Sequence, residues 1–191
     1  MSALAPAARL LYNGTLIAWL VAEVRQSRQR RGEATERDAG SRRVIRITVV
    51  LAIVVSAVVS GITRARMPWR RIDLFAVGIV VMWAGIGLRL WAFRTLGRYF
   101  TFTVMTSDDQ PVVSNGPYRV LRHPSYAGAL LACVGIGIVQ GNWLSIAAIV
   151  VITLIGMVNR IRVEERALFD ALGDRYRTYA AGRKRLVPFV W

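Results

Sequence analysis

The sequence predicts an all-α integral membrane protein with about five transmembrane helices. Of its 191 residues, 54% are hydrophobic, and the mean hydropathy is positive at +0.41. The apolar residues gather in runs, several of which approach or exceed the roughly 20 residues that a helix needs to cross a bilayer core. Because a backbone in lipid must satisfy its own hydrogen bonds, such runs form helices even where β-branched residues dominate.

Five apolar runs follow one another along the chain. They cover residues 10–24, 44–62, 72–93, 126–139 and 143–158. The first three make up an N-terminal membrane region, residues 1–93, with a basic loop at 25–43. The last two are joined only by Gln140, Gly141 and Asn142, so they predict an antiparallel helical hairpin over 126–158.

The second region, residues 94–191, contains this hairpin and two polar segments. One polar segment, 94–125, precedes the hairpin. The other is the tail, 159–191, which reads as an amphipathic helix over 163–172 that ends at Gly173. In the third apolar run, Gly78, Gly85 and Gly87 would allow close contact with a neighbouring helix.

Basic residues indicate the sidedness. The segments 25–43, 94–125 and 159–191 hold 19 of the 26 lysines and arginines, and five crossings place all three on one side of the membrane. The positive-inside rule makes that side cytoplasmic. The four arginines of the link 63–71 argue mildly against this topology, but the reverse topology violates the rule more strongly.

Composition also excludes several functions. The net charge of +15 comes almost entirely from arginine, which in a soluble protein would indicate nucleic-acid binding. Here the charges lie between apolar runs, where anionic membrane lipids account for them, so we expect no nucleic-acid partner. A single histidine and one cysteine, Cys133 inside an apolar run, cannot build a zinc site. No GxSxG elbow or phosphate-binding loop is present.

The stretch 115–128, NGPYRVLRHPSYAG, contains the candidate chemistry. Pro117 and Pro124 restrict the backbone and shape a turn that leads into the fourth apolar run. The polar and aromatic side chains of the turn are Tyr118, Arg119, Arg122, His123 (the only histidine of the chain) and Tyr126. Arginines and tyrosines at a helix end are also typical of membrane-interface anchors, and this second interpretation stands beside the first.

The start of the tail supplies complementary charges. Arg160 and Glu164 are four residues apart, so they share one side of a helix that continues from the fifth run, and Glu165 follows. Since one polar segment enters the hairpin and the other leaves it, this side of the helix can face Arg122 and His123. The alternative is a surface helix whose glutamates pair with nearby arginines, in exposed ion pairs that contribute about 0–1 kcal/mol each.

Three groups of residues together resemble a known family. They are Gly116-Pro117-Tyr118-Arg119; Arg122-His123-Pro124-Ser125-Tyr126 with Gly128; and Glu164-Glu165 followed by Gly173, Tyr176, Tyr179, Arg185 and Pro188. In this order they resemble the isoprenylcysteine carboxyl methyltransferase family and the related phospholipid methyltransferases. The resemblance covers about residues 87–191. It rests on the combination of turn, hairpin and paired glutamates, because each piece alone is common.

The resemblance implies S-adenosylmethionine-dependent methyl transfer to a lipophilic acceptor, in a cytosol-facing pocket formed by the loop before the last hairpin and the tail. Family cofactor contacts would fall on Gln110, Pro111, Val112, Val113, Tyr118, Arg122, His123, Pro124, Ser125, Tyr126 and Glu164. Thr103 would lie near the cofactor, and the family's arginine for the acceptor carboxylate falls on Arg160. Gln110 and Pro111 stand where animal members often have a histidine.

The chemistry of S-adenosylmethionine suits these residue types. Its carboxylate requires arginine or imidazole donors, and its ammonium requires a carboxylate such as Glu164. Its adenine requires an apolar or aromatic surface, for which Tyr118, Val112 and Val113 are candidates. A carboxylate acceptor is already ionised at neutral pH, so positioning and desolvation would determine the rate. An amine acceptor would first lose a proton, and Glu165 or a tyrosine would then matter as a base.

Several alternatives stay open at this point. The acceptor could be a prenylated cysteine, a phospholipid amine or a small lipophilic carboxylic acid. Membrane sterol and steroid reductases, which use NADPH, share an HPxYxG-like turn and a similar tail. A non-catalytic protein whose arginine-rich loops bind anionic lipid or a partner would also match the composition. The paired glutamates and the short hairpin link favour the methyltransferase.

Overall fold

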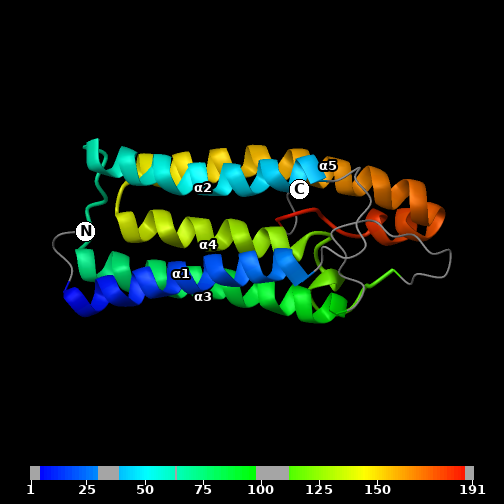
Figure 1. The fold of residues 1–191 in the computed structure, drawn as a ribbon, viewed down its shortest axis with the longest axis horizontal. Helices are drawn as coiled ribbons and strands as arrows, with labels where there is room; N and C mark the ends of the chain where they lie inside the picture. The colour runs from blue at the N-terminus through cyan, green and yellow to red at the C-terminus, as the bar shows by residue number, and fades with distance from the viewer. Residues whose placement is uncertain (1–4, 30–38, 63, 98–111, 188–191) are drawn as a thin grey trace.

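The long helices of the described residues lie side by side in the computed structural model (Figure 1). They are α1 (Pro6–Gln29), α2 (Ala39–Ile62), α3 (Arg71–Leu96), α4 (Pro124–Gln140) and α5 (Trp143–Ala181), and a 3-10 turn, η3 (Gly116–Arg119), precedes α4. The structure describes residues 5–29, 39–62, 64–97 and 112–187. In these ranges each predicted apolar run lies in one helix and β-pairing is limited to isolated bridges, which confirms the all-α prediction.

The helices are those of a multi-pass membrane protein. Among the described residues, α2, α3 and α5 are long and apolar enough to cross a membrane. The outer face of α2 is strongly apolar, and Ile47 and Val58 on it are 66% and 55% exposed. The 17-residue α4 is apolar but shorter than these three, and α1 does not meet the same criterion of length and hydropathy. The number of crossings therefore stays a prediction.

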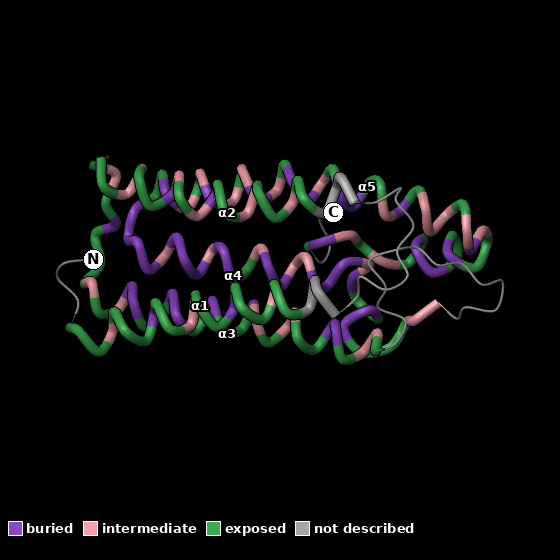
Figure 2. Tube along the Cα trace, viewed as in Figure 1, coloured by how far each residue is buried: buried purple, intermediate pink, exposed green. Residues whose placement is uncertain are grey.

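The centre of the bundle is α4. It packs along α3 on one side and along α5 on the other, while α2 lies against α5 and α1 lies along α3 (Figure 1). Nearly every residue of α4 is buried or half-buried, with Leu131 as the exception (Figure 2). Both ends of α4 are thus held by its neighbours, including the end that carries His123.

Glycines bring α3 and α4 into backbone contact, as predicted for two of the three glycines in α3. A Cβ atom built on Gly78 would lie 2.8 Å from the carbonyl oxygen of Gly135, and one built on Gly85 would lie 2.5 Å from that of Gly128. Gly87 faces away from α4, and among the described residues no neighbouring atom lies within 4 Å of a Cβ built there, so its part in helix packing stays a prediction. Small residues at these positions let the two helices approach closely.

We expect Gly85→Ala to destabilise the bundle. The added methyl group would meet the backbone of α4, which cannot move aside as a flexible side chain could. Overpacking of this kind typically costs about 1–3 kcal/mol. Gly87→Ala is the matched control, since it adds the same methyl group to the same helix in open space. Thermal unfolding in detergent should show a lower midpoint for Gly85→Ala alone; equal midpoints would contradict the proposed contact.

The predicted hairpin is present, and its second helix extends into the tail. The Asn142 side chain caps α5 by accepting hydrogen bonds from the backbone N–H groups of Leu144 and Ser145, at 2.9 and 3.2 Å. Gly156 keeps helical dihedral angles, and Gly173 is the position in α5 where they become non-helical, so the apolar run and the amphipathic tail form one continuous helix up to Gly173. Gly173 has φ +52°, a conformation that glycine adopts readily, and α5 changes direction there.

Candidate active site

The turn before α4 is held in place by the segment that follows α5. The backbone N–H groups of Arg122 and His123 donate hydrogen bonds to the carbonyl oxygens of Lys184 and Arg185, at 2.8 and 3.0 Å. The Tyr179 hydroxyl, beyond the Gly173 bend, donates to the carbonyl oxygen of Tyr118 at 3.0 Å. The segment entering the hairpin and the segment leaving it are therefore joined by backbone hydrogen bonds. This confirms the prediction that the two segments are neighbours in space.

Glu165 is the centre of a buried charge cluster. Its side chain is 5% exposed. Oε1 accepts a hydrogen bond from Arg122 Nη1 at 2.7 Å and lies 3.3 Å from His123 Nε2, while Oε2 accepts from Arg185 Nε at 2.8 Å. A buried carboxylate is costly unless cations and donors surround it. Here these partners come from the turn and from the chain after α5, so Glu165 connects three segments.

We expect Glu165→Ala to destabilise the folded protein by about 3–5 kcal/mol, because removing one partner of a buried ion pair leaves the other charges uncompensated. The buried His123 and the half-buried Arg122 would then lack their shared carboxylate. The measurement is thermal or denaturant unfolding in detergent. Asp170→Ala, at an exposed position of the same helix, should change stability little. A Glu165→Ala variant as stable as Asp170→Ala would contradict the proposed role of the cluster.

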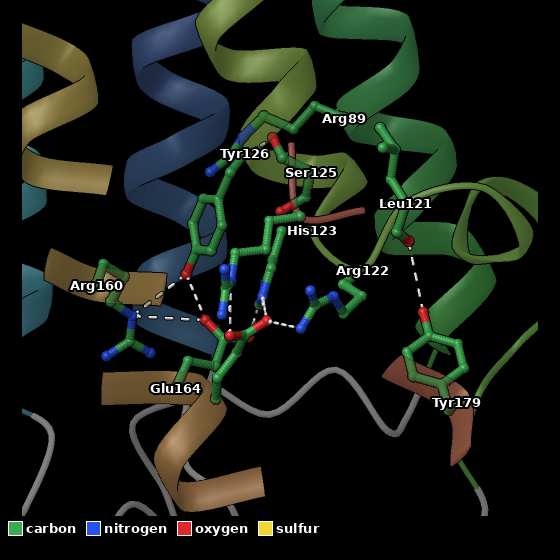
Figure 3. A network of polar contacts seen from close by, with 11 residues as sticks. Arg89, Leu121, Arg122, His123, Ser125, Tyr126, Arg160, Glu164 and Tyr179 are labelled. Atoms are coloured by element: carbon green, nitrogen blue, oxygen red, sulfur yellow. Dashed lines mark hydrogen bonds and ion pairs between the residues drawn. The ribbon is translucent and has the colours of Figure 1, made fainter. Parts of the chain in front are cut away.

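Glu164 belongs to a second, more open cluster (Figure 3). Its side chain is 29% exposed. Glu164 Oε2 accepts a hydrogen bond from the Tyr126 hydroxyl at 2.7 Å, and that hydroxyl accepts one from Arg160 Nε at 3.2 Å. Arg160 itself is 4% exposed. His123 adjoins both clusters, since its Nδ1 lies 3.9 Å from Glu164 Oε1 and its ring stacks on Tyr126 with centroids 5.7 Å apart.

The structure brings together the predicted residues Arg122, His123, Tyr126, Arg160, Glu164 and Glu165. The side of α5 that carries Arg160 and Glu164 was expected to face Arg122 and His123; His123 lies beside Glu164, and Arg122 pairs with Glu165. The interpretation of these glutamates as members of exposed surface pairs is wrong for Glu165, which is buried and bonded to the turn before α4.

The remaining predicted residues lie around these clusters. Pro124 and Ser125 are buried in the first turn of α4. Val112 and Val113 are half-buried, and Val112 packs against a small apolar cluster that includes Tyr176. Gln110, Pro111 and Thr103 lie outside the described residues.

Tyr118 is buried in η3. Burial, together with the nearby negative charge of Glu164, raises the pKa of the Tyr118 phenol, so it is a neutral aromatic surface at physiological pH.

Sequence reasoning missed the contribution of Glu23 and Arg89. Arg89 Nη1 donates a hydrogen bond to the carbonyl oxygen of Ser125 at 2.8 Å, and both oxygens of Glu23 bind the same guanidinium group. A signal was present, because each is a charge near the end of an apolar run, and ionisable groups in membrane helices usually have partners. Glu23 is near the C-terminal end of the first run and Arg89 near that of the third, and because these two runs are expected to cross in the same direction, the two charges could have been paired on that basis.

Comparisons with known proteins identify the family. The profile of the phospholipid methyltransferase family matches residues 74–175. A probable protein-S-isoprenylcysteine O-methyltransferase of Oryza sativa subsp. indica is 33% identical over 116 residues, which are 60% of this chain and 61% of that protein. Protein-S-isoprenylcysteine O-methyltransferase A of Arabidopsis thaliana is 34% identical over 115 residues, 59% of this chain and 58% of that protein.

A solved structure is also similar. The eukaryotic intramembrane Ras methyltransferase ICMT (isoprenylcysteine carboxyl methyltransferase) aligns with a TM-score of 0.58 and 28% sequence identity, over 75% of this chain and 52% of that one. The chain thus spans about three fifths of the length of the curated relatives and about half of the solved protein. The profile match covers more than half of the chain and includes both the turn before α4 and the paired glutamates of α5, and we conclude that the chain belongs to the phospholipid methyltransferase family.

Proposed function

We propose that this protein is a membrane-embedded, S-adenosylmethionine-dependent methyltransferase whose acceptor is a lipophilic carboxylate, as the relatives' names suggest. The observation that carries the proposal is the convergence of His123 and Tyr126 from the start of α4 with Arg160 and Glu164 from α5 (Figure 3). All four residues lie in the range that the family profile matches. Such a cluster combines anionic and cationic groups at one end of a mainly apolar bundle.

The donor set fits S-adenosylmethionine. When bound, this molecule supplies an electrophilic methyl group on a sulfonium. Glu164 is half-buried and held by Tyr126, so its carboxylate can bind an ammonium group. His123 and Arg122 offer donors for a carboxylate, with Pro124 and Ser125 shaping the turn between them and Tyr126.

The remaining contacts would be apolar. The neutral aromatic ring of Tyr118, with Val112 and Val113, suits an adenine. Gln110 and Pro111, which precede Val112 in the sequence, are included among the proposed cofactor contacts because of the family resemblance.

Arg160 favours a carboxylate acceptor. Its guanidinium group is almost fully buried just beyond the apolar part of α5, where a lipophilic molecule with an anionic head would meet it. Holding that head against a fixed cation in a low-dielectric region would orient the nucleophile and remove its water. An amine acceptor would need a base, and Glu165 is a poor one because two arginines already bind it. We therefore assign Glu165 a positioning role in the reaction.

In this proposal the methyl acceptor is a prenylated cysteine, a lipid or a small lipophilic acid, and the protein itself is in contact with membrane lipids. In our proposal all five helices cross the bilayer and the site faces the cytoplasm. The site lies where α3 ends, where α4 begins and where α5 leaves the bundle, at one end of the molecule (Figure 1). The arginine-rich segments identified in the sequence adjoin these helix ends, in agreement with the positive-inside rule.

The test is methyl transfer by the purified protein in lipid nanodiscs. Methyl-labelled S-adenosylmethionine would be supplied with an S-farnesylated cysteine derivative, and in parallel with an amine phospholipid. We expect a labelled, base-labile methyl ester of the cysteine derivative by mass spectrometry, and no saturable NADPH binding. Labelling of the phospholipid amine alone would overturn the carboxylate assignment. Absence of S-adenosylmethionine binding would overturn the methyltransferase assignment itself.

A further inference from the structure

A charge pair inside the bundle connects α1 to the start of α4. Arg89 on α3 donates from Nε to Glu23 Oε1 and from Nη2 to Glu23 Oε2, the latter at 2.8 Å. The two side chains are 11% and 30% exposed. Trp19, one turn earlier on α1, donates from Nε1 to Glu23 Oε1 at 3.2 Å. The carboxylate is therefore fixed by two neighbours, and the guanidinium group is held at two of its nitrogens.

The third nitrogen of the same guanidinium group points to the candidate site. Arg89 Nη1 donates to the carbonyl oxygen of Ser125 at 2.8 Å (Figure 3). Ser125 is the second residue of α4, directly before Tyr126 and two residues after His123. The backbone is close here as well, because a Cβ built on Gly128 would lie 2.8 Å from the Arg89 backbone nitrogen. Arg89 thus contacts the turn of α4 that presents both side chains.

The pair with Glu23 determines where Arg89 can point. Arginine stays protonated in proteins, so its charge must find a partner in a poorly solvated region. A carboxylate that binds two of its nitrogens side by side leaves the planar group a single orientation, in which Nη1 faces the Ser125 carbonyl. Without the carboxylate, the long side chain would turn towards water or lipid headgroups and release that carbonyl oxygen.

We propose that Glu23 is a positioning residue of the active site, which acts through Arg89 to hold the first turn of α4. This inference rests on the proposed function. It gives α1, which lies outside the range matched by the family profile, a part in binding the methyl donor. Tyr126 bonds to Glu164 and Arg160 from this turn, so a loosened turn would weaken the donor site without removing any group that touches the donor.

The test compares Glu23→Gln, Arg89→Gln and the double variant in nanodiscs. We expect Glu23→Gln to raise KM and Kd for S-adenosylmethionine about tenfold, with kcat at saturating donor within about twofold of wild type. Because Glu23 acts through Arg89, adding Glu23→Gln to Arg89→Gln should change KM no further. Thr15→Val is the matched control; it removes a different contact between α1 and α3, the 3.4 Å hydrogen bond from Trp83 Nε1 to Thr15 Oγ1, and should leave KM unchanged.

A readout independent of catalysis separates this inference from the proposed function. Hydrogen exchange of backbone amides in a peptide covering residues 121–130 should speed up in Glu23→Gln and stay as in wild type in Thr15→Val. An unchanged KM with unchanged exchange in a folded Glu23→Gln protein would overturn the positioning role. If the wild-type protein bound no donor, the proposed function would fail, and the exchange experiment would still decide whether Glu23 holds the turn.

Discussion

Glu164→Gln is expected to weaken S-adenosylmethionine binding by about 10- to 100-fold while the protein stays folded. The carboxylate is the anionic group in the open cluster that can meet an ammonium, and hydrogen bonds to charged groups are typically worth about 1.5–3 kcal/mol. Glutamine keeps the shape and can still accept from the Tyr126 hydroxyl, so the change isolates the charge. Equilibrium binding of labelled donor to purified protein measures the effect.

Asp170→Asn is the matched control for this variant. It makes the same chemical change at an exposed position of α5, six residues further along the helix. Donor binding to Asp170→Asn should equal that of the wild type, because an exposed side chain in the tail helix has no proposed contact with the donor. If Glu164→Gln and Asp170→Asn bound the donor equally well, Glu164 could not be the group that holds the ammonium.

Arg160→Ala is expected to abolish most turnover, by about 100-fold or more, and to leave donor binding within a few-fold of wild type. The reason is that a buried cation holds the acceptor carboxylate in position, and orientation of this kind supplies several kcal/mol of the catalytic effect. Losing the side chain also removes the hydrogen bond that Arg160 Nε donates to Tyr126. Initial rates with the S-farnesylated cysteine derivative, and separate donor-binding curves, distinguish the two effects.

Two further variants sharpen the Arg160 experiment. Arg162→Ala, on the exposed face of the same turn, should retain full turnover. Arg160→Lys keeps the charge but loses the planar group that pairs with a carboxylate through two nitrogens, so intermediate turnover is expected. Normal turnover by Arg160→Ala would show that the acceptor is held elsewhere, and a parallel loss of donor binding would show that Arg160 serves the donor instead.

The sequence predicted the helices well because their signals are local. A run of apolar residues in lipid has few alternatives to a helix, and the three-residue link between the last two runs permits only a hairpin. The polar residues around His123 and the paired glutamates could be selected as candidates because they interrupt or follow apolar runs, and their family was suggested by resemblance. Their chemistry is visible in the residue types, and the shortness of the hairpin link predicts that the segments at its mouth are neighbours.

Partner choice within the site could not be predicted in the same way. Glu164 and Glu165 are adjacent in the sequence and chemically equal, yet one is half-exposed beside Tyr126 and the other is buried among Arg122, His123 and Arg185. Consecutive residues on a helix point about 100° apart, so the packing of α5 against the turn decided which of the two carboxylates is buried and which is half-exposed. Gly87 and Gly85 differ for the same reason, since only one of them faces α4.

The amino-acid sequence by itself determined that this is a helical membrane protein with a polar turn before its last hairpin, because hydrophobic run length and residue chemistry act locally; methyl transfer was implied by the resemblance of that turn and the paired glutamates to a known family. Only the tertiary structure decided that Glu23 and Arg89, 66 residues apart, meet each other and the Ser125 carbonyl. Long-range pairing depends on how α1 lies against α3, and apolar helix surfaces in lipid do not encode that arrangement in their composition.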